Sequence, residues 1–363
     1  MHRTQPYEIF NISINFYTHN HKEYEMNQPN LFSFATSELS QDAFLCWLLS
    51  WADPSHANTD PELHRLGSAL LKDLIIKAKG DLPLISKVLV KRQYQHLDVL
   101  CLVNDDLVLI IEDKTVTTEH GNQLQRYKEQ MISQYPHAQV LGIYYKSEEQ
   151  SSFRDVRKSG FEPYLRQDVL KLLTTHATEN AIVKDYYGYL SSIQTNINNY
   201  NVLHVDEWKN SQRTWIGFYQ WLQQAMDIGD NSYTAWKYVA NPSGGFMGYF
   251  WAFKATGLSD TEIYLQLEHE RLCIKISVSE TNNRSEHRAH FYRLATDIAA
   301  ALNLPLVKPP RFGHGEYMTI CQWPGDYRIF DSAGVIDLGK TLERIRSLET
   351  ILEHVVSTQA CAL

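Results

Sequence analysis

Two apolar runs separated by three polar residues constrain the fold of this chain more than any other feature. Residues 97–103 (LDVLCLV) and 107–112 (LVLIIE) are apolar on both faces of an extended strand, apart from the charged Asp98 and Glu112. The residues between them, 104–106 (NDD), suit a tight turn. Strands that are apolar on both faces need cover on both sides, so the runs predict the central hairpin of a covered sheet.

Charged side chains gather at the end of this hairpin that lies away from the turn. If the strands turn symmetrically about Asp105, the numbers of facing residues sum to 210, and Asp98 lies opposite Glu112. Facing residues hold their Cβ atoms about 4.5–5.5 Å apart. Lys114 projects from the same face as Glu112, and Asp113 projects from the other face. A register shift of one residue would remove Asp98 from this face.

Two carboxylates and one ammonium group at the end of a buried hairpin allow two interpretations. Neighbouring carboxylates repel each other unless a cation joins them, and Mg²⁺ in proteins takes one or two carboxylates. Alternatively, Asp98, Glu112 and Lys114 form a structural ion-pair cluster without chemistry. The spacing alone leaves both interpretations open.

The patterns around the hairpin predict a mixed α/β unit. Apolar spacing after Ser40 predicts a buried helix that Asp53-Pro54 ends, and alternation at residues 12–16 suggests an edge strand. Further helices are expected at residues 61–79, 119–134, 166–175 and 180–199, and further strands at 87–94 and 139–145.

A second unit follows the polar segment 200–212, which we interpret as a linker. We place the domains at residues 1–205 and 206–363. The second domain is expected to be α+β, with helices at residues 212–226, 286–302 and 339–356 and strands at 246–254, 262–267, 272–278 and 316–322.

Composition limits the class of protein. The chain has 363 residues and a net charge of −8, which argues against a simple coat for nucleic acid. The five cysteines form no C-x-x-C pair, which disfavours a zinc ribbon or a disulfide scaffold, and Cys46 and Cys101 are expected in the core. No signal peptide or membrane span is visible, so we expect a soluble, cytoplasmic protein without membrane partners.

Three segments in order resemble the PD-(D/E)XK nuclease superfamily, which includes restriction-endonuclease-like and RecB-like nucleases. They are residues 38–49 (ELSQDAFLCWLL), the hairpin from Asp98 to Lys114, and residues 119–127 (EHGNQLQRY). The first segment is similar to the N-terminal helix of a bacterial subgroup, and the third contains the Q-x-x-x-Y pattern of RecB-like nucleases. The resemblance covers roughly residues 30–145. Leu97 stands where the motif's name has a proline.

The resemblance implies a restriction-endonuclease-like mixed sheet flanked by helices, and it assigns roles to the hairpin residues. Asp98 and Glu112 would bind the metal ion, Mg²⁺ with Mn²⁺ as a substitute, and Glu38 would supply a further ligand. Lys114 would orient the attacking water or stabilise the charged transition state. A hard divalent ion would polarise a phosphodiester oxygen and activate bound water.

The residues that flank the motif each have an ordinary alternative. Gln123 and Tyr127 share one helical face and could overlook the site, or they form a polar helix surface. Glu38 could instead compensate the dipole at a helix start. The same interpretation is preferred for Asp42, which could alternatively contact the site indirectly, through a residue that binds it. His120 is expected to be an exposed residue before a helix.

Basic and aromatic residues near the chain's C-terminal third suggest a nucleic-acid surface. Arg284, Arg288 and Arg311 are the candidate contacts, and a solvated helix face with a surface loop is the alternative. A tryptophan cluster is expected in a core or a dimer contact rather than in a base-stacking platform: Trp208, Trp215, Trp221 and Trp236.

The favoured function is that of a metal-dependent phosphodiesterase that hydrolyses DNA, in defence against phage or foreign DNA. The defence role rests on the functions of similar enzymes and on no residue of this chain. Two alternatives remain open: a nuclease fold that binds nucleic acid without cleaving it, and a ribonuclease of toxin type. A homodimer is compatible with each of them.

Overall fold

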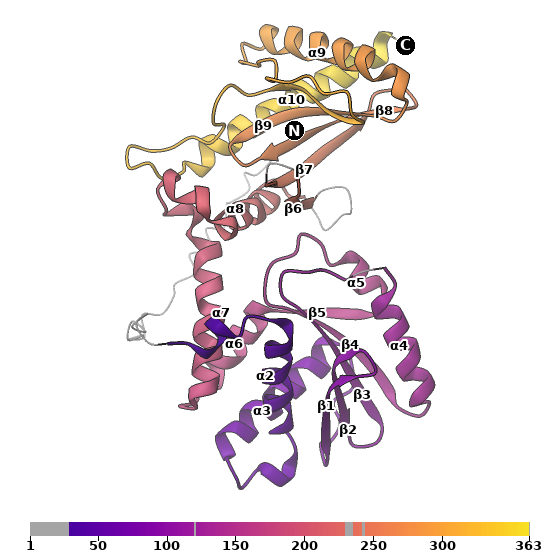
Figure 1. Cartoon of the computed structure of the whole chain (residues 1–363), viewed down its shortest axis with the longest axis vertical. Coiled ribbons are helices and arrows are strands. Elements are labelled where there is room, and N and C mark those ends of the chain that lie inside the picture. Colours follow the sequence, from indigo (N-terminus) through magenta and orange to yellow (C-terminus); the bar gives the residue numbers. More distant parts are fainter. Residues whose placement is uncertain (1–28, 120, 229–234, 242–243, 363) are drawn as a thin grey trace, which may run out of the picture.

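The computed structural model describes residues 29–119, 121–228, 235–241 and 244–362 and contains two five-stranded sheets (Figure 1). The edge strand expected at residues 12–16 and the residue His120 lie outside the described residues. We call the first sheet with its helices the first unit, and the second sheet with its helices the second unit.

The first sheet is mixed, as the sequence predicts. Its strand order is β1-β2-β3-β4-β5, with β1 to β3 antiparallel and with β3, β4 and β5 parallel. Strand β3 therefore lies in the middle of the sheet. The strands are β1 (Val88–Tyr94), β2 (Leu97–Val103), β3 (Leu107–Lys114), β4 (Gln139–Lys146) and β5 (Phe161–Leu165).

The register of the β2–β3 hairpin confirms the symmetric turn about Asp105. Val99 pairs with Ile111 and Cys101 with Leu109, so the numbers of each pair sum to 210. From Val99 to Ile111, odd-numbered side chains of the hairpin enter one core and even-numbered side chains enter another. The central hairpin is thus covered on both faces, as its composition requires.

Helices cover the two faces of this sheet. Side chains of α2, α3, α6 and α7 share the first core, and side chains of α4 and α5 share the second. The helices of the first unit are α1 (Leu31–Phe34), α2 (Glu38–Ser50), α3 (Pro61–Lys77), α4 (Gln123–Gln134), α5 (Arg154–Lys158), α6 (Arg166–Thr175) and α7 (Ala181–Asn198).

Two helix starts differ from the sequence-based expectation, and a local cap explains the first of them. Helix α2 begins at Glu38 rather than after Ser40, because the hydroxyl oxygen of Ser37 accepts a hydrogen bond from the backbone N–H of Ser40 at 3.3 Å. Helix α4 begins at Gln123 instead of residue 119.

The second unit is an antiparallel sheet with the order β10-β9-β8-β7-β6. Its elements are α8 (Gln212–Ala225), β6 (Ala235–Val239), β7 (Phe246–Ala255), β8 (Thr261–Glu268), β9 (Arg271–Val278), α9 (Arg284–Ala301), β10 (Tyr317–Gln322) and α10 (Leu338–Ala362). Strand β6 was not predicted. Trp208, Trp215 and Trp236 are buried in the core of this unit and Trp221 packs against it, in agreement with the expected core role.

The segment expected as a linker is ordered. Residues 200–212 include most of two short 3₁₀ helices, Asn199–Asn201 and Val205–Asn210, and the Trp208 side chain within them is buried. Burial of this large ring explains why a polar segment is folded. The proposed boundary after residue 205 falls between Ile197 of the first core and Trp208 of the second.

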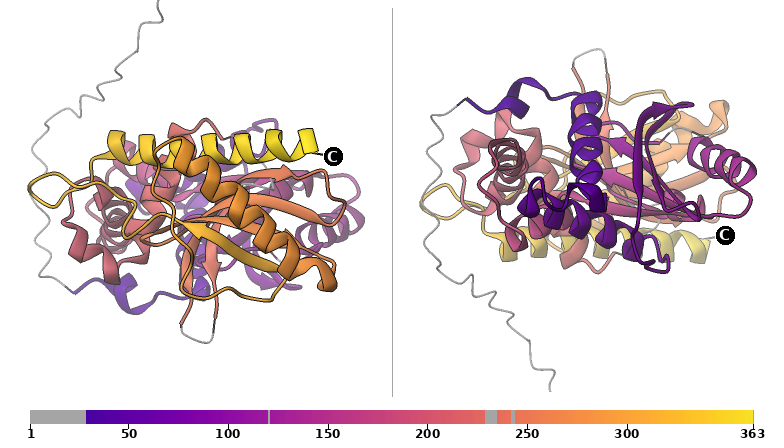
Figure 2. Two further views of the ribbon diagram at one scale, coloured as in Figure 1. Left: turned by 90° about the horizontal axis from the view of Figure 1, so that it is seen from above. Right: turned by 90° about the horizontal axis from the view of Figure 1, so that it is seen from below.

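The two units contact each other through α8 and the segment that follows β4. Arg213 Nη2 of α8 lies 2.5 Å from Glu148 Oε1, and Gln220 of α8 donates a hydrogen bond to Glu149. Helix α8 also packs along α7. Figure 2 views the molecule from above and from below, and in both views the two units overlap.

Two expectations from composition concern the cysteines and membrane-spanning segments. Cys101 is buried and Cys46 is partly buried against the first core, as expected. Among the residues that the structure describes, no helix is both long and apolar enough to cross a membrane.

Candidate active site

Asp98, Glu112 and Lys114 meet at the open end of the β2–β3 hairpin. Lys114 Nζ lies 2.5 Å from Glu112 Oε1 and 3.7 Å from Asp98 Oδ2. Asp98 Oδ2 also accepts a hydrogen bond from the backbone N–H of Asp113 at 2.9 Å. These contacts bring the two carboxylates and the ammonium group into one cluster.

Glu112 is buried in an unfavourable environment for a carboxylate. Glu112 is 1% exposed, and its Oε2 atom has no hydrogen-bond partner among the residues that the structure describes. Burial and the charge of Asp98 raise the pKa of Glu112 to about 7, against the opposing effect of Lys114. A buried carboxylate oxygen without a partner is costly, so this position favours a cation.

Lys114 keeps its charge in this cluster. Burial acts to lower the pKa of Lys114, but the carboxylates of Glu112 and Asp98 outweigh burial and raise the pKa above its ordinary value. The ammonium group is therefore positive at neutral pH, and it is available as a fixed charge beside the carboxylates.

Gln123 reaches the cluster from the first turn of α4. Its Nε2 atom donates hydrogen bonds to Glu112 Oε1 and to the hydroxyl oxygen of Tyr127, each at 2.9 Å. The structure thus places both Q-x-x-x-Y residues on the face that overlooks the site. Gln123 and Lys114 hold Glu112 Oε1, and Oε2 remains for another ligand.

Glu38 lies beside the cluster and is held by the segment after β3. Its Oε1 atom accepts hydrogen bonds from the backbone N–H of Thr115 at 3.1 Å and from the hydroxyl of Thr117 at 2.6 Å. Burial acts to raise the pKa of Glu38, but these hydrogen bonds outweigh burial and lower the pKa. Within the described chain, no three acidic, histidine or cysteine side chains converge as a ready set of metal ligands.

Lys146 fixes the segment that holds Glu38. It pairs with Lys114 in the β3–β4 register, and its side chain is fully buried. Its Nζ atom donates hydrogen bonds to the carbonyl oxygens of Thr115, at 2.6 Å, and of Thr117. Burial lowers the pKa of Lys146 to about 8, although Glu38 opposes this shift.

If the cluster binds a metal ion that supports cleavage, as the resemblance implies, Lys146→Met should weaken that cleavage by about 10–100-fold, because outer partners that orient ligands typically contribute this much. The metal concentration that gives half-maximal cleavage should rise. Lys128→Met is the matched control, since Lys128 also donates to a backbone carbonyl, that of Gly160, from α4. If Lys146→Met does not fold, Thr117→Val removes only the hydroxyl that contacts Glu38. An unchanged metal requirement in both variants would contradict this role.

Asp42 is a buried residue rather than a charge at an exposed helix start, and our preferred interpretation of it was wrong. It lies in the first half of α2 on the side that faces the sheet, and its side chain is fully buried. Gln93 Nε2 donates hydrogen bonds to Asp42 Oδ2 at 2.9 Å and to Asp98 Oδ1 at 3.2 Å. Burial and then the charge of Asp98 raise the pKa of Asp42 to about 6. Asp42 thus contacts the site through Gln93.

Two glutamines that position acidic residues, Gln93 and Gln41, were not predicted from the sequence. Gln41 donates a hydrogen bond to Asp113, which lies on the opposite face of β3 from Glu112 and is fully buried. Burial and Asp42 raise the pKa of Asp113 well above its ordinary value. The one available signal for Gln41 was a polar pair, Gln41-Asp42, directly before the apolar run 43–49.

The arginines predicted as nucleic-acid contacts are mostly used inside the second unit. Arg288 is buried, donates a hydrogen bond to the carbonyl oxygen of Gly313 and lies 4.6 Å from the ring centroid of Phe312. Arg284 donates to the carbonyl oxygens of Val278 and Ser279. Arg311 is exposed.

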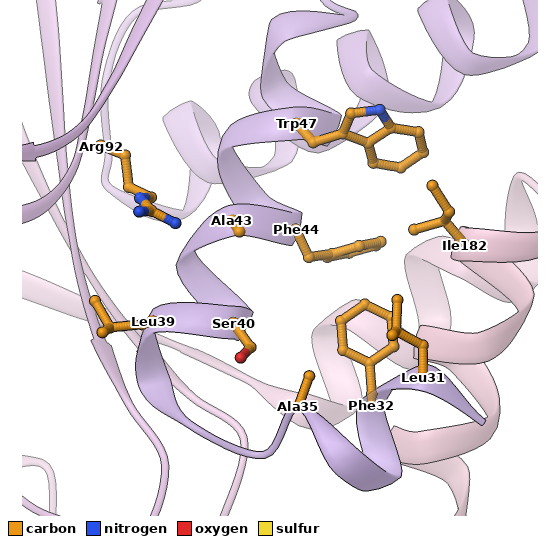
Figure 3. Close-up of a pocket in the computed structure, with 10 residues that line it drawn as sticks. All are labelled: Leu31, Phe32, Ala35, Leu39, Ser40, Ala43, Phe44, Trp47, Arg92 and Ile182. Carbon is orange, nitrogen blue, oxygen red and sulfur yellow. The ribbon is translucent and has the colours of Figure 1, made fainter. Parts of the chain in front are cut away.

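A pocket of about 450 Å³ lies between α1, α2 and the start of α7 (Figure 3). Its lining is largely apolar, with rings of Phe32, Phe44 and Trp47 and with Arg92 at one side. Its lining contains no acidic side chain, so the pocket is not part of the candidate site.

Comparison with known families decides the identity of the fold. The sequence model of the PD-(D/E)XK nuclease superfamily matches residues 29–220, slightly more than half of the chain. This chain belongs to the PD-(D/E)XK nuclease superfamily. The match begins just before α1, covers the whole first sheet and ends in α8. No curated protein and no solved structure matches the chain. Membership in this nuclease superfamily indicates that the chain is a nuclease with a nucleic-acid substrate.

Proposed function

We propose that this PD-(D/E)XK protein hydrolyses phosphodiester bonds in DNA with Mg²⁺, and that Mn²⁺ can replace Mg²⁺. The observation that carries the proposal is the cluster at the end of β3. Glu112 is buried 2.5 Å from the Lys114 ammonium group, and its second carboxylate oxygen has no hydrogen-bond partner. A role in defence against phage or foreign DNA belongs to the proposal, and it rests on the functions of enzymes that this chain resembles and on none of its own residues.

The residues of the cluster fit a hard divalent cation. Mg²⁺ prefers oxygen ligands and needs only one or two protein carboxylates, which Asp98 and Glu112 would provide. We propose Glu38 as a further ligand, because it lies beside this pair and its Oε1 is fixed by Thr115 and Thr117. When bound, the cation would polarise the phosphodiester and lower the pKa of water.

The chain's own residues supply the remaining chemistry. Lys114 provides a fixed positive charge for the oxygens on which negative charge develops in the transition state. It also orients the attacking water. Gln123 donates to Glu112 Oε1 and therefore keeps the carboxylate in one orientation. Tyr127 accepts a hydrogen bond from Gln123 and acts through it.

The alternatives make different predictions about catalysis. An inactive nuclease fold would have no need to keep Asp98, Glu112 and Lys114 together, and their convergence argues against it. A ribonuclease of toxin type would use the same cluster, so only the substrate separates it from a deoxyribonuclease.

The test is cleavage of labelled DNA and RNA, single-stranded and double-stranded, in Mg²⁺, in Mn²⁺ and in EDTA. We expect cleavage of DNA in either metal ion and none in EDTA. Cleavage that persists in EDTA would contradict a metal-dependent mechanism, and cleavage of RNA alone would favour the ribonuclease. Light scattering on the same sample measures whether the chain forms the homodimer that we include in the proposal.

A further inference from the structure

The helices of the second unit pack on one face of its sheet. Ile263, Leu265 and Leu267 of β8 share a core with side chains of α8, α9 and α10. Figures 1 and 2 show α9 and α10 above this sheet and the first unit below it. We call the opposite face of this sheet the open face.

Aromatic rings lie on the open face. The strand registers place Phe250 and Tyr264 there, and Tyr317 of β10 pairs with Ser277 on the same side. The ring of Phe253 stacks on that of Tyr264, with centroids 4.8 Å apart and an interplanar angle of 15°. Phe253 is 37% exposed and Tyr317 is 65% exposed. Large exposed rings on a sheet face mark a surface for a partner.

Basic side chains accompany these rings. Lys237 of β6 is exposed, and its Nζ atom lies 5.7 Å from the ring centroid of Phe250. Lys275 Nζ lies 3.1 Å from the hydroxyl of Thr319 and 3.4 Å from Glu268. Glu268 is buried and also pairs with Arg271, so its negative charge is balanced. Lys237 beside Phe250 suits a phosphate beside a base. On the opposite edge strand, Tyr317 has the acidic neighbours Glu316 and Glu262.

The second unit is attached at the catalytic end of the first sheet. Lys114 pairs with Lys146 at the end of the parallel β3–β4 pair. Two residues later, Glu148 binds Arg213 of α8, and Glu149 binds Gln220 of the same helix. The acidic cluster and helix α8 of the second unit are thus connected through one short segment.

We propose that the open face binds single-stranded nucleic acid and delivers the strand to the nuclease site. The bases stack on Phe253 and Tyr317, and a phosphate lies near Lys237. Stacking on protein rings needs unstacked bases, which a single strand offers and a duplex does not. This surface replaces Arg284 and Arg288 as the main contact, because both belong to α9 on the other side of the sheet. The inference deepens the proposed nuclease function and rests on it for its purpose.

The test measures binding without cleavage. Fluorescence anisotropy of the full chain in EDTA uses labelled single-stranded DNA and single-stranded RNA, each about 20 nucleotides long to exceed a typical binding site, and the matching DNA duplex. We expect the full chain to bind the single strands more tightly than the duplex. The double variant Phe253→Ala/Tyr317→Ala should weaken single-strand binding at least about tenfold. Lys237→Ala should weaken it less and reduce the dependence on salt.

Phe34→Ala is the matched control, because Phe34 is 83% exposed but lies on α1 of the first unit. Circular dichroism checks that each variant is folded, and Lys237→Glu, a surface change, tests the face if the double variant is not. Tighter binding of the duplex, or single-strand binding unchanged in both open-face variants, would overturn the inference. An absence of cleavage with intact single-strand binding would instead contradict only the proposed nuclease function.

Discussion

Lys114→Met is expected to lower the rate of metal-dependent phosphodiester cleavage by about 10²–10³-fold, the usual effect of removing one preorganised group that stabilises transition-state charge. The substitution keeps the aliphatic part of the side chain and removes the ammonium group, which lies 2.5 Å from Glu112 and 3.7 Å from Asp98. Single-turnover cleavage of labelled DNA under excess enzyme measures the rate of the chemical step.

Two further measurements make this result specific. Lys87→Met removes an ammonium group near the turn of the same hairpin, where Lys87 contacts Asp105, and it should leave the rate unchanged. Lys114→Met should still gain thermal stability from the metal ion, since Asp98 and Glu112 remain. Cleavage at the wild-type rate in Lys114→Met would remove the lysine from the mechanism.

Asp98→Asn is expected to abolish the stabilisation of the wild-type first unit by Mg²⁺ or Mn²⁺. At a metal concentration about 100 times Kd, binding to the folded state contributes about 2.7 kcal/mol. For a unit of this size, that raises the melting temperature by about 5–10 °C. Differential scanning fluorimetry with and without metal measures the shift.

Asp105→Asn provides the control for charge. Asp105 lies in the turn of the same hairpin, and its side chain is 94% exposed. This variant should retain the full shift in melting temperature. A metal-induced shift that survives in Asp98→Asn but is lost in Asp105→Asn would place the metal at the wrong end of the hairpin.

The parts of the fold that the sequence predicts best are those with a strong local pattern. The β2–β3 hairpin is apolar on both faces, so its central position followed from residue types, and its register followed from the assumption of a symmetric turn about Asp105. Strand β5 was missed because it is short, contains Pro163 and lies at the edge of the sheet, where a proline is tolerated. Strand β6 is also an edge strand.

The candidate site likewise contains some residues that the sequence predicts and others that it does not. Asp98, Glu112 and Lys114 were placed together by the period of two residues along a strand, and Gln123 was placed by helical spacing after the family motif was recognised. The roles of Gln93 and Lys146 depend on contacts between segments far apart in the sequence. A single lysine at the end of an apolar strand carries no signal that it binds two backbone carbonyls.

Anomalous diffraction from crystals of the full chain soaked in Mn²⁺ tests the central claim most directly. We predict an anomalous peak within coordination distance of the carboxylates of Asp98 and Glu112, and its absence in crystals of Glu112→Gln. Soaked crystals with no peak at this pair, in a protein that still cleaves DNA only with added metal, would contradict the assignment of the site.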